Sequence, residues 1–258
     1  MILYIPNLGG RDLWCGRETL YAEVARDMLL NGHWFVPHFN GEIYFNKPPL
    51  YFWLIALISM PVGDVTEFTL RLPSALSALG TVLVVYFLGK RLYGARTGFL
   101  AGVILASSPG FHKYACVAKL EAPLCLFITA SIAAFYVGLT TSSNKRRYFL
   151  WGWFLMGLAM LTKGLGVVLI APVIFLYLLS RRELRRVWET EPVLGGLILL
   201  ATMMAWLVPG YVSGGPEYIH SLVEHFSHHV GQSPKYMKPF YYITESFVGT
   251  LPWSLVLP

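Results

Sequence analysis

Apolar residues dominate the chain in long runs that short polar connections separate. A helix that crosses a membrane needs about 20 mostly apolar residues. The runs therefore predict an all-α polytopic membrane protein with about seven spans. They cover residues 72–89, 98–115, 123–140, 148–161, 165–180, 193–212 and 239 onward.

The first 71 residues follow a different pattern. Residues 20–29 place apolar side chains at helical spacing and charged ones on the opposite face, and Asn31-Gly32 ends this pattern. Residues 50–62 are apolar but too short to span. Both segments are therefore predicted to be helices that lie in the membrane interface.

Every second connection between the apolar runs is basic. Membrane proteins keep an excess of Lys and Arg in their cytoplasmic loops, so these connections predict the cytoplasmic side. Residues 1–71 then form an outer, periplasmic loop, and residues 72–258 form the transmembrane bundle. The basic clusters are Lys90-Arg91 with Arg96, Lys145-Arg146-Arg147, and Arg181-Arg182 with Arg185-Arg186.

Composition agrees with this topology. With 55% hydrophobic and only 13% charged residues, the chain lacks the polar surface that a soluble domain needs. The net charge of +6 resides in the connections, so it reflects topology and does not predict binding of nucleic acid. Both ends fall within or near apolar sequence, and we expect the chain to be a piece of a longer protein.

Lys47-Pro48-Pro49 lies between the two predicted interfacial helices. Proline removes a backbone donor and restricts the residue before it, so this segment should be rigid and non-helical. It would hold Lys47 at the start of the following apolar helix. A lysine fixed at the membrane surface predicts a site for an anionic lipid headgroup.

Three further charged residues lie in the predicted outer segments. Glu18 is either a first-turn acid that a helix N-terminus stabilises or a general base. Glu121 is either a helix cap or a catalytic partner. Lys163 stands alone between two apolar runs, where a lysine must snorkel to the interface or bind an anion such as phosphate.

Histidines gather in the last predicted outer segment. His225 and His229 are one helical turn apart, with Glu224 and His228 beside them. Imidazole and carboxylate groups at this spacing can bind a divalent metal. Such a stretch on an outer helix is more often simply a solvated face, and both interpretations remain open.

Several motifs in order make the chain similar to one family. The sequence resembles the bacterial branch of the protein mannosyltransferase superfamily, which includes the aminoarabinose transferases that modify lipid A. The similarity covers essentially the whole chain. The motifs lie at Asp12-Leu13-Trp14, residues 21–29, Asn40-Gly41, residues 44–50, Arg71-Leu72-Pro73-Ser74, residues 119–123 and Leu161-Thr162-Lys163-Gly164.

The resemblance implies a GT-C glycosyltransferase of the inner membrane. Such an enzyme transfers a sugar from a polyprenyl-phosphate donor to a lipid (lipid A-like) or protein acceptor on the periplasmic side. It further implies roles for the outer residues. Lys47 and Lys163 would contact the donor phosphate, Glu18 would be the catalytic base that activates the acceptor, and Glu121 would be a supporting catalytic carboxylate. Tyr21, Tyr44 and Asn46 would contact the substrate, and His225 would belong to the donor site or bind a divalent metal (Zn²⁺, Mg²⁺ or Mn²⁺).

Three positions depart from the family pattern. Arg17 and Asn46 stand where family members usually carry acids, and Glu121 stands where they carry aspartate. Asn46 has no anionic oxygen for a metal. A noncatalytic protein that binds lipid phosphate is therefore the alternative function. A transporter is disfavoured because the charged groups lie at one face, with none at mid-membrane depth.

Overall fold

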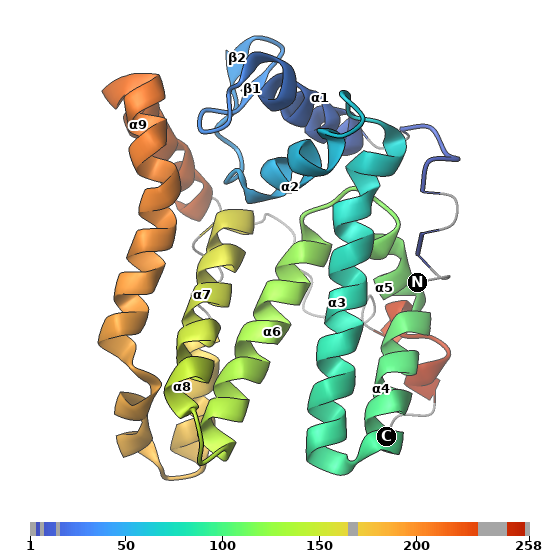
Figure 1. The fold of residues 1–258 in the computed structure, drawn as a ribbon, viewed down its shortest axis with the longest axis vertical. Helices are drawn as coiled ribbons and strands as arrows, with labels where there is room; N and C mark the ends of the chain where they lie inside the picture. Colours follow the sequence, from blue (N-terminus) through green and yellow to red (C-terminus); the bar gives the residue numbers. More distant parts are fainter. Residues whose placement is uncertain (1–3, 6–7, 14–15, 165–169, 232–246, 256–258) are drawn as a thin grey trace.

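The chain folds into a helical bundle with a small cap at one end (Figure 1). The structure is a computed structural model. It describes residues 4–5, 8–13, 16–164, 170–231 and 247–255, except for the side chains of residues 225–231.

The cap consists of two helices and a hairpin. Helix α1 spans Gly16–Asn31 and α2 spans Leu50–Ser59. Between them, β1 (His38–Phe39) pairs antiparallel with β2 (Glu42–Ile43). The structure thus confirms both helices predicted in the first 71 residues, but α2 ends three residues before the predicted boundary at Val62. The short hairpin was not predicted.

The apolar face of α1 forms the core of the cap. Val24 and Met28 of α1 are fully buried together with Phe52 and Ile55 of α2 and Leu70 of the next helix. These α1 residues recur at helical spacing, as the sequence predicted. Burial of this shared face fixes the cap on the bundle.

Seven helices form the rest of the fold in the described residues. Three helices are long and apolar enough to cross a membrane, namely Glu67–Tyr93, Glu121–Thr140 and Pro192–Glu224. The helices Leu50–Ser59, Ala95–Ser107 and Ile170–Ser180 are also apolar but shorter. The bounds are α3 Glu67–Tyr93, α4 Ala95–Ser107, α5 Pro109–Ala115, α6 Glu121–Thr140, α7 Lys145–Lys163, α8 Ile170–Ser180 and α9 Pro192–Gly231.

Two predicted helices differ from the structure. The run 98–115 is divided into α4 and α5 because Ser108 is extended (φ −69°, ψ 122°) and Pro109 starts a new helix. The run 193–212 continues to Gly231, with a kink where Gly215 takes a φ of 71°.

Two other predicted runs are described only in part. Of the run that begins at residue 239, positions 239–246 lie outside the described residues. Its later part ends in a short 3₁₀ helix, Trp253–Leu255, which reaches α4 through a hydrogen bond of 3.0 Å from Trp253 Nε1 to Ser107 Oγ. Positions 165–169, before α8, are likewise outside the description.

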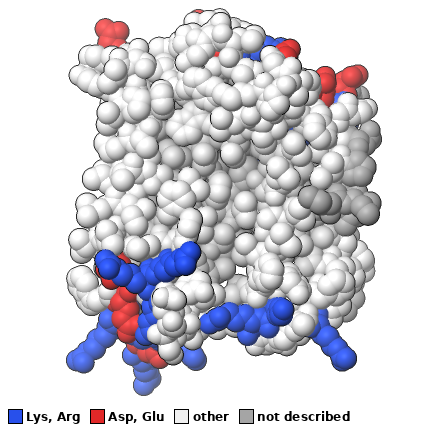
Figure 2. Space-filling view, in the orientation of Figure 1, with Lys and Arg blue, Asp and Glu red and all other residues white. Residues whose placement is uncertain are grey.

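Positive side chains gather at the end of the bundle opposite the cap (Figure 2). The turns at that end follow α3, α6 and α8 (Figure 1). The basic clusters that the sequence analysis identified lie in these turns and in the helix ends beside them. Connections on the capped end alternate with them. The charge distribution therefore gives the bundle two chemically different ends.

Helices α6 and α7 interlock through two glycines. A Cβ at Gly138 of α6 would lie 2.6 Å from the ring of Phe149, and a Cβ at Gly152 of α7 would lie 2.8 Å from the ring of Phe135. Each ring thus occupies the space that the opposite glycine leaves. Ser131 Oγ also donates to the Gly152 carbonyl at 2.8 Å. These contacts fix the axial register of the two helices.

Arg71 of α3 joins the cap to the bundle. Its side chain is fully buried, and its Nε and Nη2 donate to the two carboxylate oxygens of Glu18 at 3.1 and 3.0 Å. The guanidinium also donates to the carbonyls of Leu8, Arg11 and Asp12. A single side chain therefore donates hydrogen bonds both to a residue in the first turn of α1 and to the backbone carbonyls of the segment before it.

We expect Arg71→Met to destabilise the protein strongly. The substitution would leave the Glu18 carboxylate buried without its cation, and losing one partner of a buried pair costs about 3–5 kcal/mol. Thermal or chemical unfolding in detergent measures the difference.

Arg26→Met provides the matched control. Arg26 makes an equally bidentate contact, with Asp64 at 2.7 and 3.3 Å, but the two side chains are 38% and 56% exposed. The loss should be about 0–1 kcal/mol, as for exposed ion pairs. Equal losses in the two variants would contradict the central role of Arg71.

Candidate functional site

Four charged residues from separate elements lie near one another on the capped side of the bundle. Arg17 is in the first turn of α1 and Lys47 precedes α2, while Glu121 begins α6 and Lys163 ends α7. The Lys163 ammonium lies 3.5 Å from the Glu121 carboxylate. We call Arg17, Lys47, Glu121 and Lys163 the charged group.

The two prolines after Lys47 hold it in place. Pro48 and Pro49 are buried, and Pro49 is the N-cap of α2 with φ −83°. Before Lys47, the ring of Phe45 stacks on Tyr218 of α9 at a centroid distance of 5.7 Å. The segment is therefore non-helical, as the sequence predicted. It also contacts α9 through Phe45, which the sequence did not predict.

The electrostatics of the charged group favour an anion. Burial lowers the pKa of the Lys47 ammonium, and repulsion by Lys163 and Arg17 lowers it further, while Glu121 partly opposes the shift. Three cations thus face one carboxylate. A bound anion would relieve their repulsion, and phosphate suits such a group because its oxygens accept several charge-assisted hydrogen bonds.

The predicted substrate residues differ in their surroundings. Tyr44 is half-buried near Arg17, and burial raises the pKa of its hydroxyl to about 12. Asn46 is exposed beside Lys47. Tyr21 is only 5% exposed and packs edge-on against Tyr51 and Phe52 in the core of the cap. The surroundings of Tyr44 and Asn46 suit contact with a ligand better than those of Tyr21.

Glu18 is 1% exposed. Besides its pairing with Arg71, its Oε1 accepts the backbone N–H of Ala118 at 2.7 Å. Burial would raise the pKa of Glu18, but the hydrogen bonds from Arg71 and Ala118 outweigh it, and the pKa is lowered. A carboxylate so stabilised in its charged form is a poor proton acceptor, and the geometry disfavours the predicted role as general base.

Glu121 offers a more accessible carboxylate. Its side chain is 37% exposed, in contrast to 1% for Glu18, and it lies within the charged group. The N-cap of α6 is Leu120, without a side-chain cap hydrogen bond, so the prediction that Glu121 caps the helix is wrong. Glu121 is instead a first-turn acid, which the helix dipole favours, and its role as catalytic partner stays a prediction.

The metal prediction at His225 stays a prediction. His225 belongs to α9, but its side chain and those of His228 and His229 lie outside the described residues. Asn46, beside Lys47, offers a neutral amide. Among the described residues, one group of three metal-binding side chains lies elsewhere in the cap, namely Asp27, His33 and His38.

Sequence reasoning placed Arg17 among the polar groups of the first outer segment without giving it a role, and it missed the position of Arg71. Arg71 had appeared only within a motif, although an arginine at the start of an apolar run is costly unless it is paired, which is a usable signal. The partner of Arg71 is 53 positions away, so the sequence could not identify it.

Comparisons with known proteins identify the family of the chain. The sequence model for dolichyl-phosphate-mannose-protein mannosyltransferase matches residues 46–208. An undecaprenyl phosphate-alpha-4-amino-4-deoxy-L-arabinose arabinosyl transferase of Aeromonas salmonicida is 32% identical over 269 residues, covering 100% of this chain and 48% of the relative. An uncharacterized protein of Aquifex aeolicus is 32% identical over 99% of this chain and 51% of the relative.

Two solved structures share the fold. The crystal structure of ArnT from Cupriavidus metallidurans in the apo state superposes with a TM-score of 0.87 at 26% identity. The same protein bound to undecaprenyl phosphate gives a TM-score of 0.91 at 27% identity. Each comparison covers 100% of this chain and 48% of the solved chain.

The chain spans about half the length of the curated relatives it matches. The superpositions confirm the all-α, polytopic GT-C membrane fold that the sequence predicted. The match of the family model over residues 46–208 extends through most of the sequence and includes Lys47, Glu121 and Lys163. The chain therefore belongs to the dolichyl-phosphate-mannose-protein mannosyltransferase family.

Proposed function

We propose that this chain provides the donor site of a membrane glycosyltransferase. The donor is a sugar linked to a polyprenyl phosphate, and the acceptor is a lipid A-like lipid or a protein. The observation that carries the proposal is the convergence of Lys47 and Lys163 with Arg17 on the capped side. The undecaprenyl phosphate bound by the solved ArnT structure supports the same ligand chemistry.

Charge development during transfer explains why such a site needs cations. The bond between the sugar's anomeric carbon and the phosphate oxygen breaks, and a new bond forms from that carbon to an acceptor oxygen or nitrogen. The phosphate keeps the bonding electrons and gains negative charge. Lys47, Lys163 and Arg17 would stabilise that charge as it develops, which lowers the barrier.

The acceptor must lose a proton in the same reaction. Glu121 is the better candidate for the general base because its carboxylate is accessible and lies 3.5 Å from the Lys163 ammonium, close to the proposed phosphate position. Glu18 then acts as a positioning residue, since its pairing with Arg71 holds α1 and therefore Arg17. We also propose that His225 binds a divalent metal, which would supply further positive charge for the donor phosphate.

The orientation follows from the basic end of the bundle. We place the basic turns after α3, α6 and α8 in the cytoplasm, according to the positive-inside tendency. The charged group then faces the periplasmic side of the inner membrane. This side agrees with an acceptor that is modified after it has left the cytoplasm.

One set of observations favours a second function, donor binding without transfer. Arg17 and Asn46 replace the acids that family members usually carry, and Glu18, the acid beside Arg17, is engaged by Arg71. A site with surplus positive charge and few free acids can retain a phosphate without activating an acceptor.

We expect Glu121→Gln to reduce transfer by about 10²–10⁴-fold, the usual range for loss of a general base. The melting temperature should change little, because the lost ion pair with Lys163 is exposed. Donor binding should not weaken, because the substitution removes a negative charge beside the proposed phosphate position. The assay is transfer of radiolabelled sugar from polyprenyl-phosphate donors in membranes that contain the protein. Normal transfer by this variant would refute the assigned base.

Glu18→Gln is the matched carboxyl-to-amide control. It should lower the melting temperature, because Arg71 loses its counter-charge in a buried position. A variant of normal stability without transfer would instead favour Glu18 as the base.

The affinity for polyprenyl phosphate should fall as pH rises. Binding needs the charged Lys47 ammonium, whose pKa is lowered, so the ammonium is lost at a lower pH than in an ordinary lysine. A bound phosphate raises that pKa again, and binding therefore takes up a proton. Equilibrium binding between about pH 7 and pH 10 covers this window.

Lys47→Arg should flatten the pH profile, since a guanidinium stays charged throughout this range. Lys113→Arg is the control at an exposed lysine outside the charged group and should leave the profile unchanged. Parallel profiles for the wild type and Lys47→Arg would contradict the contact between Lys47 and the phosphate.

A double reversal separates the two functions. If the protein only binds the donor, Arg17→Asp combined with Asn46→Glu should create transfer that the wild type lacks. If the protein is an active transferase, the wild type transfers sugar in the same assay. Donor binding without transfer by both proteins would favour the binding function and show that these two acids are insufficient.

A further inference from the structure

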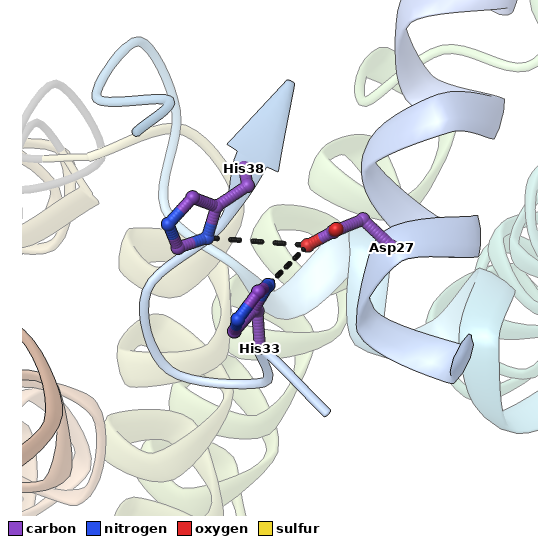
Figure 3. Close-up of side chains that lie close together, drawn as sticks. All are labelled: Asp27, His33 and His38. Atoms are coloured by element: carbon purple, nitrogen blue, oxygen red, sulfur yellow. Dashed lines mark hydrogen bonds and ion pairs between the residues drawn. The ribbon is translucent and has the colours of Figure 1, made fainter. Parts of the chain in front are cut away.

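A second cluster of polar side chains lies in the cap, at the C-terminal part of α1. Asp27 Oδ2 is 2.8 Å from Nδ1 of His33 and 3.9 Å from Nδ1 of His38 (Figure 3). The two imidazole rings have a centroid distance of 4.1 Å. Both rings thus direct a nitrogen toward one carboxylate oxygen.

Local structure builds this cluster from three elements. Asp27 belongs to α1, and Asn31 Nδ2 donates to its Oδ1 at 2.7 Å, which leaves Oδ2 for the histidines. Gly32 takes a positive φ of 76° after the last residue of α1 and reverses the chain. His33 therefore returns beside Asp27, and β1 brings His38 to the same place.

We propose that Asp27, His33 and His38 bind a divalent ion of the Zn²⁺ class. Zn²⁺ binds imidazole nitrogen and carboxylate oxygen at about 2.0–2.2 Å, so atoms that share one ion lie about 3–4 Å apart. The observed distances of 2.8 and 3.9 Å are close to this range. The His33 side chain is 44% exposed, which leaves room for water as a fourth ligand.

Zn²⁺ must compete with two existing hydrogen bonds. It replaces the contact between His33 and Asp27, and it displaces Nδ1 of His38 from the Val36 carbonyl, where that contact measures 2.8 Å. These hydrogen bonds give modest net stability, although the one to the Asp27 carboxylate is stronger than a neutral bond, and coordination is stronger than both. The negative end of the α1 dipole favours a cation at this position.

The ion would secure the loop between the two histidines. Within that loop, the Trp34 carbonyl accepts from Trp53 of α2 at 2.5 Å, and the Phe35 carbonyl accepts from Trp206 of α9 at 3.1 Å and from Tyr218 at 3.4 Å. The loop is therefore a contact between the cap and α9. A metal bound at its two ends makes this a structural site, separate from the charged group that contains Lys47.

Zn²⁺ titration of the detergent-purified, chelator-stripped protein tests the proposal. Calorimetry and elemental analysis should find a tightly bound equivalent that depends on Asp27 and His33, in addition to any ion bound at His225. Asp27→Asn and His33→Ala should each weaken binding by more than about tenfold. Zn²⁺ should also slow amide hydrogen exchange at residues 34–36 in the wild type and not in these variants.

Two controls make the outcome decisive. His220→Ala removes an exposed histidine of α9 and should keep the equivalent. The combined variant His225→Ala, His228→Ala and His229→Ala should also keep it, because those residues do not belong to the cluster. Absence of a bound equivalent, or equal affinity in the wild type, Asp27→Asn and His33→Ala, would overturn the proposal.

Discussion

The position of the cap depends on the buried guanidinium of Arg71. Removing a charge from water is costly, and a buried arginine persists only where every donor has a partner. Here the partners come from the chain before α1, from the first turn of α1 and, through Glu18, from the segment before α6. The same network that satisfies Arg71 therefore orients Arg17 and Glu121 relative to each other.

The charged group is built mainly from the ends of helices. Arg17 and Glu121 lie in first turns, and Lys163 is the last residue of α7, where the helix dipole favours a cation. Helix ends are more rigid than long loops, and Lys47 gains comparable rigidity from two buried prolines. A preorganised set of charges loses little conformational entropy when it binds an anion. This arrangement therefore suits phosphate.

Patterns within short windows made much of this fold predictable. Apolar runs and alternating basic connections identified the bundle, and the cost of isolated lysines near a membrane indicated Lys47 and Lys163. Contacts between distant positions were not predictable. Glu18 has the pattern of a first-turn acid whether it meets Arg71 or a substrate, and only the fold shows which. Asp27, His33 and His38 have irregular spacing, so their proximity depends on the turn at Gly32 and on the unpredicted hairpin.

The interlocked glycines of α6 and α7 have a consequence outside the membrane. Glu121 begins α6 and Lys163 ends α7, and the two helices run in opposite directions (Figure 1). Sliding one helix along the other by a single residue, about 1.5 Å, would move the two charges past each other by that distance. Phe149 on Gly138 and Phe135 on Gly152 resist such a slide. Apolar packing toward the basic end of the two helices thereby sets the spacing of charges at the capped end.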